Sequence, residues 1–162
     1  MLLDRYEKKI LEILQEDARI SSSDLADKVG LSQSPCWRRV NMLEESGVIR
    51  KRVVLVDRKK VGLRAQVFAQ VKLSAHGRAH LADFEAAIAD IPEVIECYVL
   101  MGTVDFLLRV ITVDIESYES LFFEKLSRLP GVQEITSSIA LSEIKNSTAL
   151  PIHLLNSGLA WH

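Results

Sequence analysis

Residues 30–47 read GLSQSPCWRRVNMLEESG, and this stretch decides the fold of the N-terminal third of the chain. Gly30 can adopt the left-handed conformation with which many helices end, and Ser32 can cap the helix that follows. Apolar residues then recur at i, i+4 and i+7, which predicts one buried stripe made of Cys36, Val40 and Leu43. Two helices joined by so short a turn are typical of a helix-turn-helix.

Two further helices are expected before this stretch. Asp4 and Glu7 have the spacing of a reciprocal helix cap, and the apolar residues behind them form one stripe on a helix that ends near Asp17. A second helix is expected to start within residues 21–23 and to stop at Gly30. The N-terminal third is therefore predicted to be a three-helix unit.

The side of the third helix that lies opposite the stripe is polar, charged and aromatic. Such side chains can exchange hydrogen bonds with base edges and phosphates, and an exposed tryptophan beside paired arginines needs an explanation. The residues expected to read DNA are Ser32, Gln33, Ser34, Trp37, Arg38 and Asn41. The residues expected to contact phosphates are Arg39, Arg50, Lys51 and Arg52. The alternative is an interaction module whose polar face only meets water.

Charge is unevenly distributed along the chain. The net charge of −2 argues against a nucleic-acid partner, but segment 31–60 carries eight Lys or Arg against three Asp or Glu. A basic segment on an otherwise acidic chain suits a phosphate-binding surface, because the field near a site steers more than the net charge does. A solvated charged surface is the alternative.

The pattern changes in the C-terminal two thirds. Alternating apolar residues predict strands at 67–73, 94–101, 105–113 and 132–143. Helical spacing predicts one helix over 77–90, with Leu81, Phe84, Ile88 and Ile91 inward, and a second helix capped by Asp114. The order β-α-β-β-α-β predicts a ferredoxin-like domain, so the fold class is α+β.

These patterns divide the chain into four parts. Residues 1–52 are expected to form the helix-turn-helix DNA-binding domain, 53–64 a strand linker, 65–145 the βαββαβ effector-binding and oligomerisation domain, and 146–162 a C-terminal tail. Residues 50–56 are rich in β-branched side chains and are expected to leave the helical domain as a strand. The pattern of the tail indicates no role.

Several classes of protein are excluded. Acidic residues near the N-terminus argue against a signal peptide, and no stretch could span a membrane, so a cytoplasmic protein without a membrane partner is expected. Cys36 and Cys97 lack the spacing of a disulfide framework or a zinc finger. His76 and His80 have the i, i+4 spacing of metal ligands, but Asp83 is turned away from them, so no metal site and no cofactor are expected. No set of catalytic residues is found.

One face of the predicted sheet lacks a cover. Helices can cover only one side of a four-stranded sheet of this topology, and the strand at 105–113 is apolar on both sides. An open apolar face of several hundred Å² is unusual in a monomer. A dimer formed through this face is therefore expected.

Several segments match one known family, namely residues 3–11 (with Leu3, Asp4, Ile10 and Leu11), 30–44 (G-L-S-x-S-P-C-x-x-R-V-x-x-L-E), 47–49, 95–108 with Gly102-x-x-Asp105, and 129–132. The chain resembles the leucine-responsive regulatory protein / asparagine-synthase regulator (Lrp/AsnC) family of transcription factors over essentially its whole length. The resemblance implies a winged helix-turn-helix that a strand joins to a ligand-sensing domain, dimers that often assemble to octamers, and amino acids as effectors. Two departures are Arg58, where the family commonly has proline, and a longer, more apolar tail.

An amino-acid effector brings an ammonium, a carboxylate and a side chain, so its site needs an acceptor, donors and an apolar wall. The turn formed by Met101, Gly102, Thr103, Val104 and Asp105 offers these groups, with the Asp105 carboxylate for the ammonium. A second wall is expected from Thr136, Ser137 and Ser138, which by the resemblance would reach the site from a neighbouring subunit. The alternative is that Gly102 and Asp105 are ordinary turn residues.

The sequence thus predicts a sequence-specific transcriptional regulator, not an enzyme. Its expected partners are double-stranded DNA, an amino-acid effector and further copies of itself. The alternatives are a nucleoid-like architectural DNA-binding protein without a ligand response, or a small enzyme of the dimeric α/β-barrel type.

Overall fold

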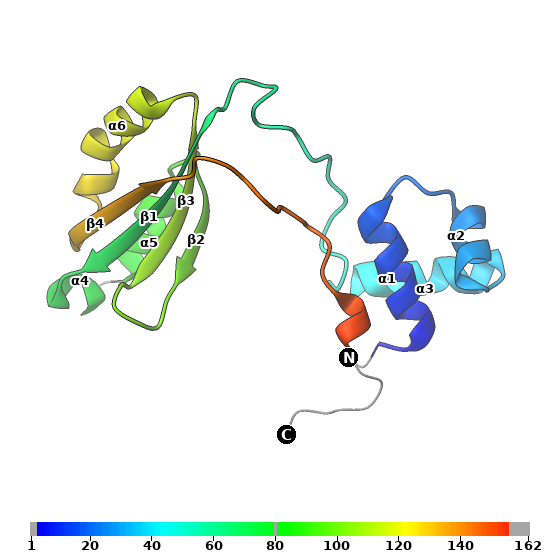
Figure 1. Ribbon diagram of the computed structural model, residues 1–162. Helices are drawn as coiled ribbons and strands as arrows, with labels where there is room; N and C mark the ends of the chain where they lie inside the picture. The colour runs from blue at the N-terminus through cyan, green and yellow to red at the C-terminus, as the bar shows by residue number, and fades with distance from the viewer. Residues whose placement is uncertain (1–2, 80, 156–162) are drawn as a thin grey trace. The chain divides into compact units, whose positions relative to one another are not determined.

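The computed structural model describes residues 3–79 and 81–155. The chain forms two compact units, of which one holds the chain up to Leu55 together with the segment from Lys145, and the other spans Val56–Ile144. Figure 1 shows the helices of the first unit and the sheet of the second. Each unit has an apolar core of its own.

The first unit contains α1 (Arg5–Glu16), α2 (Ser22–Val29) and α3 (Gln33–Glu45). The predicted reciprocal cap of α1 is confirmed: the Asp4 carboxylate accepts from the Glu7 N–H (2.9 Å), and the Glu7 carboxylate accepts from the Asp4 N–H (2.8 Å). Gly30 ends α2 with a φ of 82°, in the left-handed region that favours glycine. Ser32 occupies the N-cap of α3, but its side chain makes no capping hydrogen bond.

The core of the first unit follows the predicted stripes. Ile10 of α1 and Leu43 of α3 are fully buried in it, and α2 contributes Leu25, Ala26 and Val29. The predicted stripe of α3 is confirmed, because Cys36, Val40 and Leu43 are all buried. This packing fixes the rotation of α3 about its axis.

The predictions of a strand over 50–56 and of a strand linker over 53–64 are wrong. In the described structure no residue from Arg50 to Arg64 lies in a strand. Val53 and Val54 are 57% and 88% exposed, although β-branched residues favour strands. A strand needs hydrogen bonds from a neighbouring strand, and none of the four described strands pairs with this segment.

The second unit is a four-stranded sheet with the order β2-β3-β1-β4. Its strands are β1 (Ala65–Leu73), β2 (Val94–Val99), β3 (Phe106–Thr112) and β4 (Val132–Ile139), and every pairing is antiparallel. The α-helices are α4 (Ala75–Ala79), α5 (Leu81–Ala89) and α6 (Ile115–Glu124). Asp114 caps α6, as predicted. This order confirms the predicted βαββαβ ferredoxin-like fold.

The helices cover one face of the sheet (Figure 1), where α5 and α6 pack on alternate residues of the strands. Phe84 and Ile88 of α5 are buried there, whereas Leu81, which was expected to face inward, is 39% exposed at the first position of α5. The single helix predicted over 77–90 is described as α4 and α5. The strands predicted to reach 101 and 143 end at Val99 and Ile139.

Two glycines bring α4 and the start of β4 into close contact. A Cβ added to Gly77 would lie 2.5 Å from the carbonyl oxygen of Gly131, and Gly131 itself has a φ of 74°. The Ser74 N–H donates to the same carbonyl (2.9 Å). The end of β1 is thereby held against β4.

We expect Gly77→Ala to lower the free energy of unfolding by about 1–3 kcal/mol, because the backbone of Gly131 must shift to admit a methyl group. Urea unfolding followed by circular dichroism measures this change. Gly102→Ala is the control, since a Cβ there meets nothing within 4 Å, and its expected effect is below about 0.5 kcal/mol. Equal unfolding midpoints for the two variants would contradict the close contact.

Candidate nucleic-acid interface and effector site

The outer side of α3 presents most of the residues predicted to read DNA. Trp37 is 58% exposed, and Ser32, Gln33, Ser34 and Arg38 are exposed as well, whereas Asn41 is half-buried. On the inner side, burial raises the pKa of the Cys36 thiol. Five of the six predicted reading residues therefore lie on α3, and Ser32 is its N-cap.

Arg39 is engaged within its own unit. Its Nη1 lies 2.5 Å from Asp4 Oδ2 and 3.5 Å from Glu7 Oε1, and its guanidinium lies 5.4 Å from the centre of the Tyr6 ring. Burial raises the pKa of the Asp4 carboxyl, but hydrogen bonds from Glu7 N–H, Arg39 and Tyr6 N–H outweigh it, so this pKa is below its usual value. Arg39 thus joins α3 to the start of α1, a contact that competes with the predicted phosphate contact.

Arg52 is also paired. Its Nη2 donates to Glu44 Oε1 of α3 (2.9 Å) and its Nη1 to the Ala18 carbonyl (3.3 Å). Arg50 and Lys51 are exposed. Of the four residues predicted to contact phosphates, Arg50 and Lys51 are therefore the two for which no carboxylate contact is found in the described structure.

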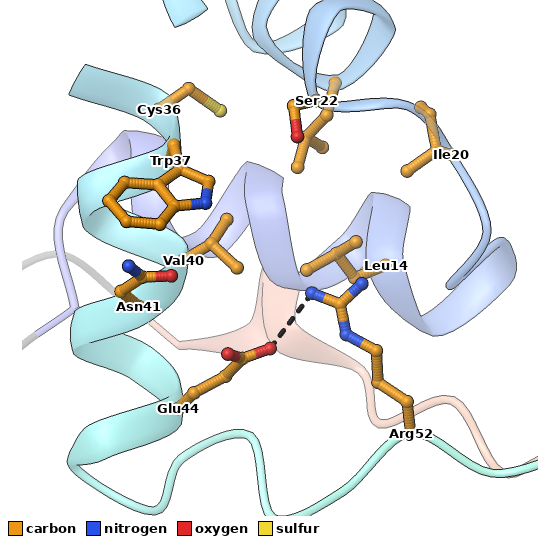
Figure 2. Close-up of a pocket in the computed structure, with 10 residues that line it drawn as sticks. Leu14, Ile20, Ser22, Cys36, Trp37, Val40, Asn41, Glu44 and Arg52 are labelled. Carbon is orange, nitrogen blue, oxygen red and sulfur yellow. Dashed lines mark hydrogen bonds and ion pairs between the residues drawn. The ribbon is translucent and has the colours of Figure 1, made fainter. Parts of the chain in front are cut away.

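A hollow of about 390 Å³ lies beside the exposed face of α3. Figure 2 shows Trp37 and Asn41 on one side of it, the apolar side chains of Leu14, Ile20 and Val40 around it, and the Glu44–Arg52 ion pair across its mouth. Ser22, at the start of α2, also lines the hollow. Arg52 thus lies beside the surface that presents two of the predicted reading residues.

The predicted effector turn lies at one end of the sheet. Met101 is fully exposed, and the backbone N–H of Asp105 donates to Val71 O (2.9 Å), which ties the turn to β1. The Asp105 carboxylate accepts from the Leu73 N–H (2.7 Å). The acid predicted to bind an ammonium group is thus also part of the backbone hydrogen bonding of the sheet.

Arg78 of α4 faces this turn, although nothing in the sequence pattern singled it out. Its Nη1 donates to Leu73 O (3.1 Å) and lies 3.4 Å from Asp105 Oδ2, and its side chain is 50% exposed. Arg78 and Asp105 therefore place a cation and an anion side by side next to an exposed turn. Only the register of β1 with β3 brings them together, and a local pattern contains no signal of it.

The prediction that the three polar residues of β4 form one wall of the effector site is wrong, because they do not share a face of the sheet. Thr136 and Ser138 pair with Gln70 and Phe68, which lie on the face without helices, whereas the Ser137 hydroxyl bonds to Tyr118 OH of α6 on the covered face. Successive side chains of a strand point to opposite faces, so a run of three cannot share one. Burial raises the pKa of Tyr118, and the hydrogen bond to Ser137 partly offsets this.

The face without helices is mixed in character. Phe68, Leu107 and Ile111 lie on it, all at least half-buried. Arg109 of β3 and Glu96 of β2 form an ion pair there, with 2.5 Å between Nη2 and Oε1. β3, which was predicted to be apolar on both faces, therefore has apolar side chains on both sides of the sheet, with Arg109 between Leu107 and Ile111 on the face without helices.

Neither a metal centre nor a membrane span is found in the described parts of the chain. Among these residues no three His, Cys, Asp or Glu gather closely enough to hold a metal ion. His80, one of the two histidines considered for metal binding, lies outside them. No described helix is long and apolar enough to cross a bilayer.

A helix-turn-helix unit joined to a ferredoxin-like sheet is the architecture that the sequence predicted for a transcriptional regulator. Residues 3–50 match the winged helix-turn-helix DNA-binding family, and residues 66–150 match the Lrp/AsnC ligand binding domain. The chain belongs to the Lrp/AsnC family of transcriptional regulators. The resemblance seen in the sequence is thus confirmed.

Curated relatives of the chain are transcriptional regulators rather than enzymes. The glutamate uptake regulatory protein of Zymomonas mobilis is 38% identical over 150 residues, which are 93% of this chain and 91% of that protein. A regulator of Neisseria meningitidis, solved in complex with L-Met, has a TM-score of 0.88 and 38% identity, covering 94% of this chain and 99% of that one. An AsnC family regulator of Agrobacterium tumefaciens has a TM-score of 0.89 and 40% identity over 95% and 100% of the two chains.

Proposed function

We propose that the outer face of α3 reads base edges in the major groove, with Trp37 and Arg38 at its centre. The observation that carries this proposal is the rotation of α3: burial of Cys36, Val40 and Leu43 leaves a tryptophan 58% exposed beside an arginine. In a helix-turn-helix the second helix of the motif enters the major groove. Arg50 and Lys51 supply phosphate contacts, while Arg39 acts within the unit.

The effector we propose is a free amino acid that binds at the turn of residues 101–105. The Neisseria relative, which binds L-Met, supports this class of ligand. Asp105 offers an acceptor for the ammonium and Arg78, 3.4 Å away, a donor for the carboxylate. Thr136 and Ser138 remain candidates from a neighbouring subunit, because they lie on the face without helices.

We further propose that two copies associate through the face of the sheet that carries Phe68, Leu107 and Ile111. Helices cover the opposite face, and these apolar side chains would otherwise meet water. Assembly of dimers into octamers remains an expectation from the family. A dimer also presents two recognition helices, as a site with two half-sites requires.

The first test separates base readers from phosphate contacts. Arg38→Ala should cost about 1–3 kcal/mol on a selected site and less on random DNA, because a base contact carries sequence preference. Lys51→Ala should weaken both DNAs alike and reduce the salt slope by about one. Arg39→Gln should leave the slope unchanged, since Asp4 and Glu7 already bind this side chain. Fluorescence anisotropy at several salt concentrations measures all three, and an unchanged preference in Arg38→Ala would contradict the orientation of α3.

The second test places the effector. A thermal-shift screen of the free amino acids identifies the ligand, because binding to the folded state raises the apparent stability. Calorimetry should then show a loss of affinity of about tenfold or more in Asp105→Asn and in Arg78→Met, which each remove one charged hydrogen bond. Asp83→Asn, an exposed acid of α5, is the control. Full affinity in both variants would move the site elsewhere, and no response to any amino acid would favour the architectural alternative.

The third test concerns assembly. Wild-type protein should sediment at low micromolar concentration as a dimer or larger species, and Leu107→Glu should shift it toward the 18.2 kDa monomer, because it buries a charge in the apolar face. Leu141→Glu, at a residue 95% exposed, should leave the distribution unchanged. A wild-type protein that sediments only as a monomer contradicts the proposal.

A further inference from the structure

Residues 145–155, the C-terminal segment, contact α1 of the first unit, which is called the DNA-binding unit from here on. The side-chain amide of Gln15 exchanges two hydrogen bonds with the backbone of Leu150, accepting from its N–H at Oε1 (2.7 Å) and donating from Nε2 to its carbonyl (3.2 Å). Lys8, two turns earlier on α1, donates to Leu155 O. In Figure 1 this segment runs from β4 to the short helix η2 (Ile152–Leu154) beside α1.

Packing accompanies these hydrogen bonds. Ile152 is half-buried and packs against the core of the first unit, whereas Leu150 and Leu154 are 67% and 66% exposed. The dock therefore depends on few groups, chiefly the Gln15 amide and the Ile152 side chain. A single amide that satisfies both backbone groups of one residue is a specific contact, because each of those groups would otherwise need water.

The dock gives the DNA-binding unit a second connection to the sheet. Just after β4, Ala140 N–H donates to Gln66 O (2.9 Å), and further along the chain the Gln15 side chain binds the backbone of Leu150. The chain from Ala140 to Leu150 can span about 35 Å at most. The other connection is the linker that follows Arg52, which Glu44 holds against α3.

We propose that segment 145–155 is a strap that limits how far the DNA-binding unit moves from the sheet, and that Gln15 is the positioning residue that fastens it. This inference rests on the proposed dimer on DNA. Two half-sites lie about 34–36 Å apart for each helical turn, so the two α3 helices must keep a defined separation. A unit on two tethers explores a smaller volume than a unit on one, which raises its effective concentration at the correct spacing and lowers it at others. The strap thus sets the tolerance for half-site spacing.

The experiment compares spacing tolerance with binding to a single half-site. A duplex is selected from a random pool by the wild-type protein, and versions with about five extra base pairs between the half-sites and with one half-site only are made. The variants are Gln15→Ala, Gln15→Ala with Ile152→Ser, and a chain that ends at Ile144. Glu16→Ala, at the exposed neighbour of Gln15, is the matched control. Hydrogen exchange at the Leu150 amide reports whether the strap is docked.

Wild type and Glu16→Ala should lose about thirtyfold or more in affinity on the respaced duplex, and the undocked variants about fivefold or less, with single half-site affinity equal within about twofold. If Gln15 only stabilised the fold, the Gln15→Ala variant would also bind the single half-site more weakly than wild type. The strap is overturned if undocked variants keep the wild-type spacing penalty, if they lose single half-site affinity to the same extent, or if wild type shows no spacing preference. If hydrogen exchange shows that the segment stays docked in the point variants, the spacing penalty of the chain that ends at Ile144 is compared with that of wild type instead. Absence of DNA binding by wild type would instead overturn the proposed function itself.

Discussion

Burial of one stripe of α3 is the constraint on which the DNA-binding unit depends. Once Cys36, Val40 and Leu43 pack against α1 and α2, the helix cannot rotate, and the side chains outside this stripe face outward. The packing of the core leaves Trp37 exposed, although contact of its ring with water is unfavourable. The same packing brings Arg39 over the start of α1, where the carboxylates that cap that helix bind it. The same packing thus separates the side of α3 that is proposed to read bases from the side that stabilises the unit.

Periodicity carried the prediction of the fold because it depends only on neighbours along the chain. The cap at Asp4, the left-handed Gly30, the stripe of α3 and the βαββαβ order all follow from local chemistry or from short repeats. The strand predicted over 50–56 failed for the converse reason. Its β-branched residues satisfy the local preference, but a strand also needs a partner edge, which no local pattern supplies.

The candidate site was predicted less completely than the fold. Ion pairs join residues that the fold brings close together, and a local sequence pattern does not show which residues these are. The helix face predicted for Trp37 and Arg38 agrees with their exposure. Arg39, however, binds the carboxylate of Asp4, 35 residues earlier in the chain, and Arg52 binds the carboxylate of Glu44 on α3. Arg78 meets Asp105 only through the pairing of β1 with β3. Residues 136–138 were treated as one polar run, whereas strand geometry sends the middle one to the covered face.

Effector binding and DNA binding are proposed for different units, and a coupling between them can pass through the chain segments that join the units or through assembly. Allosteric coupling free energies are typically about 1–3 kcal/mol, which is a factor of about 5–150 in affinity. That amount is small beside the energy that holds either core together, so neither unit needs to refold. A change in the volume that a tethered unit explores alters its effective concentration at a second half-site by factors of this size. The effector site proposed above lies at the end of the sheet near Leu73 and the start of β4, the strand from whose other end the C-terminal segment departs. Differential binding to two arrangements of that strand is therefore sufficient, in physical terms, for an effector to regulate DNA binding.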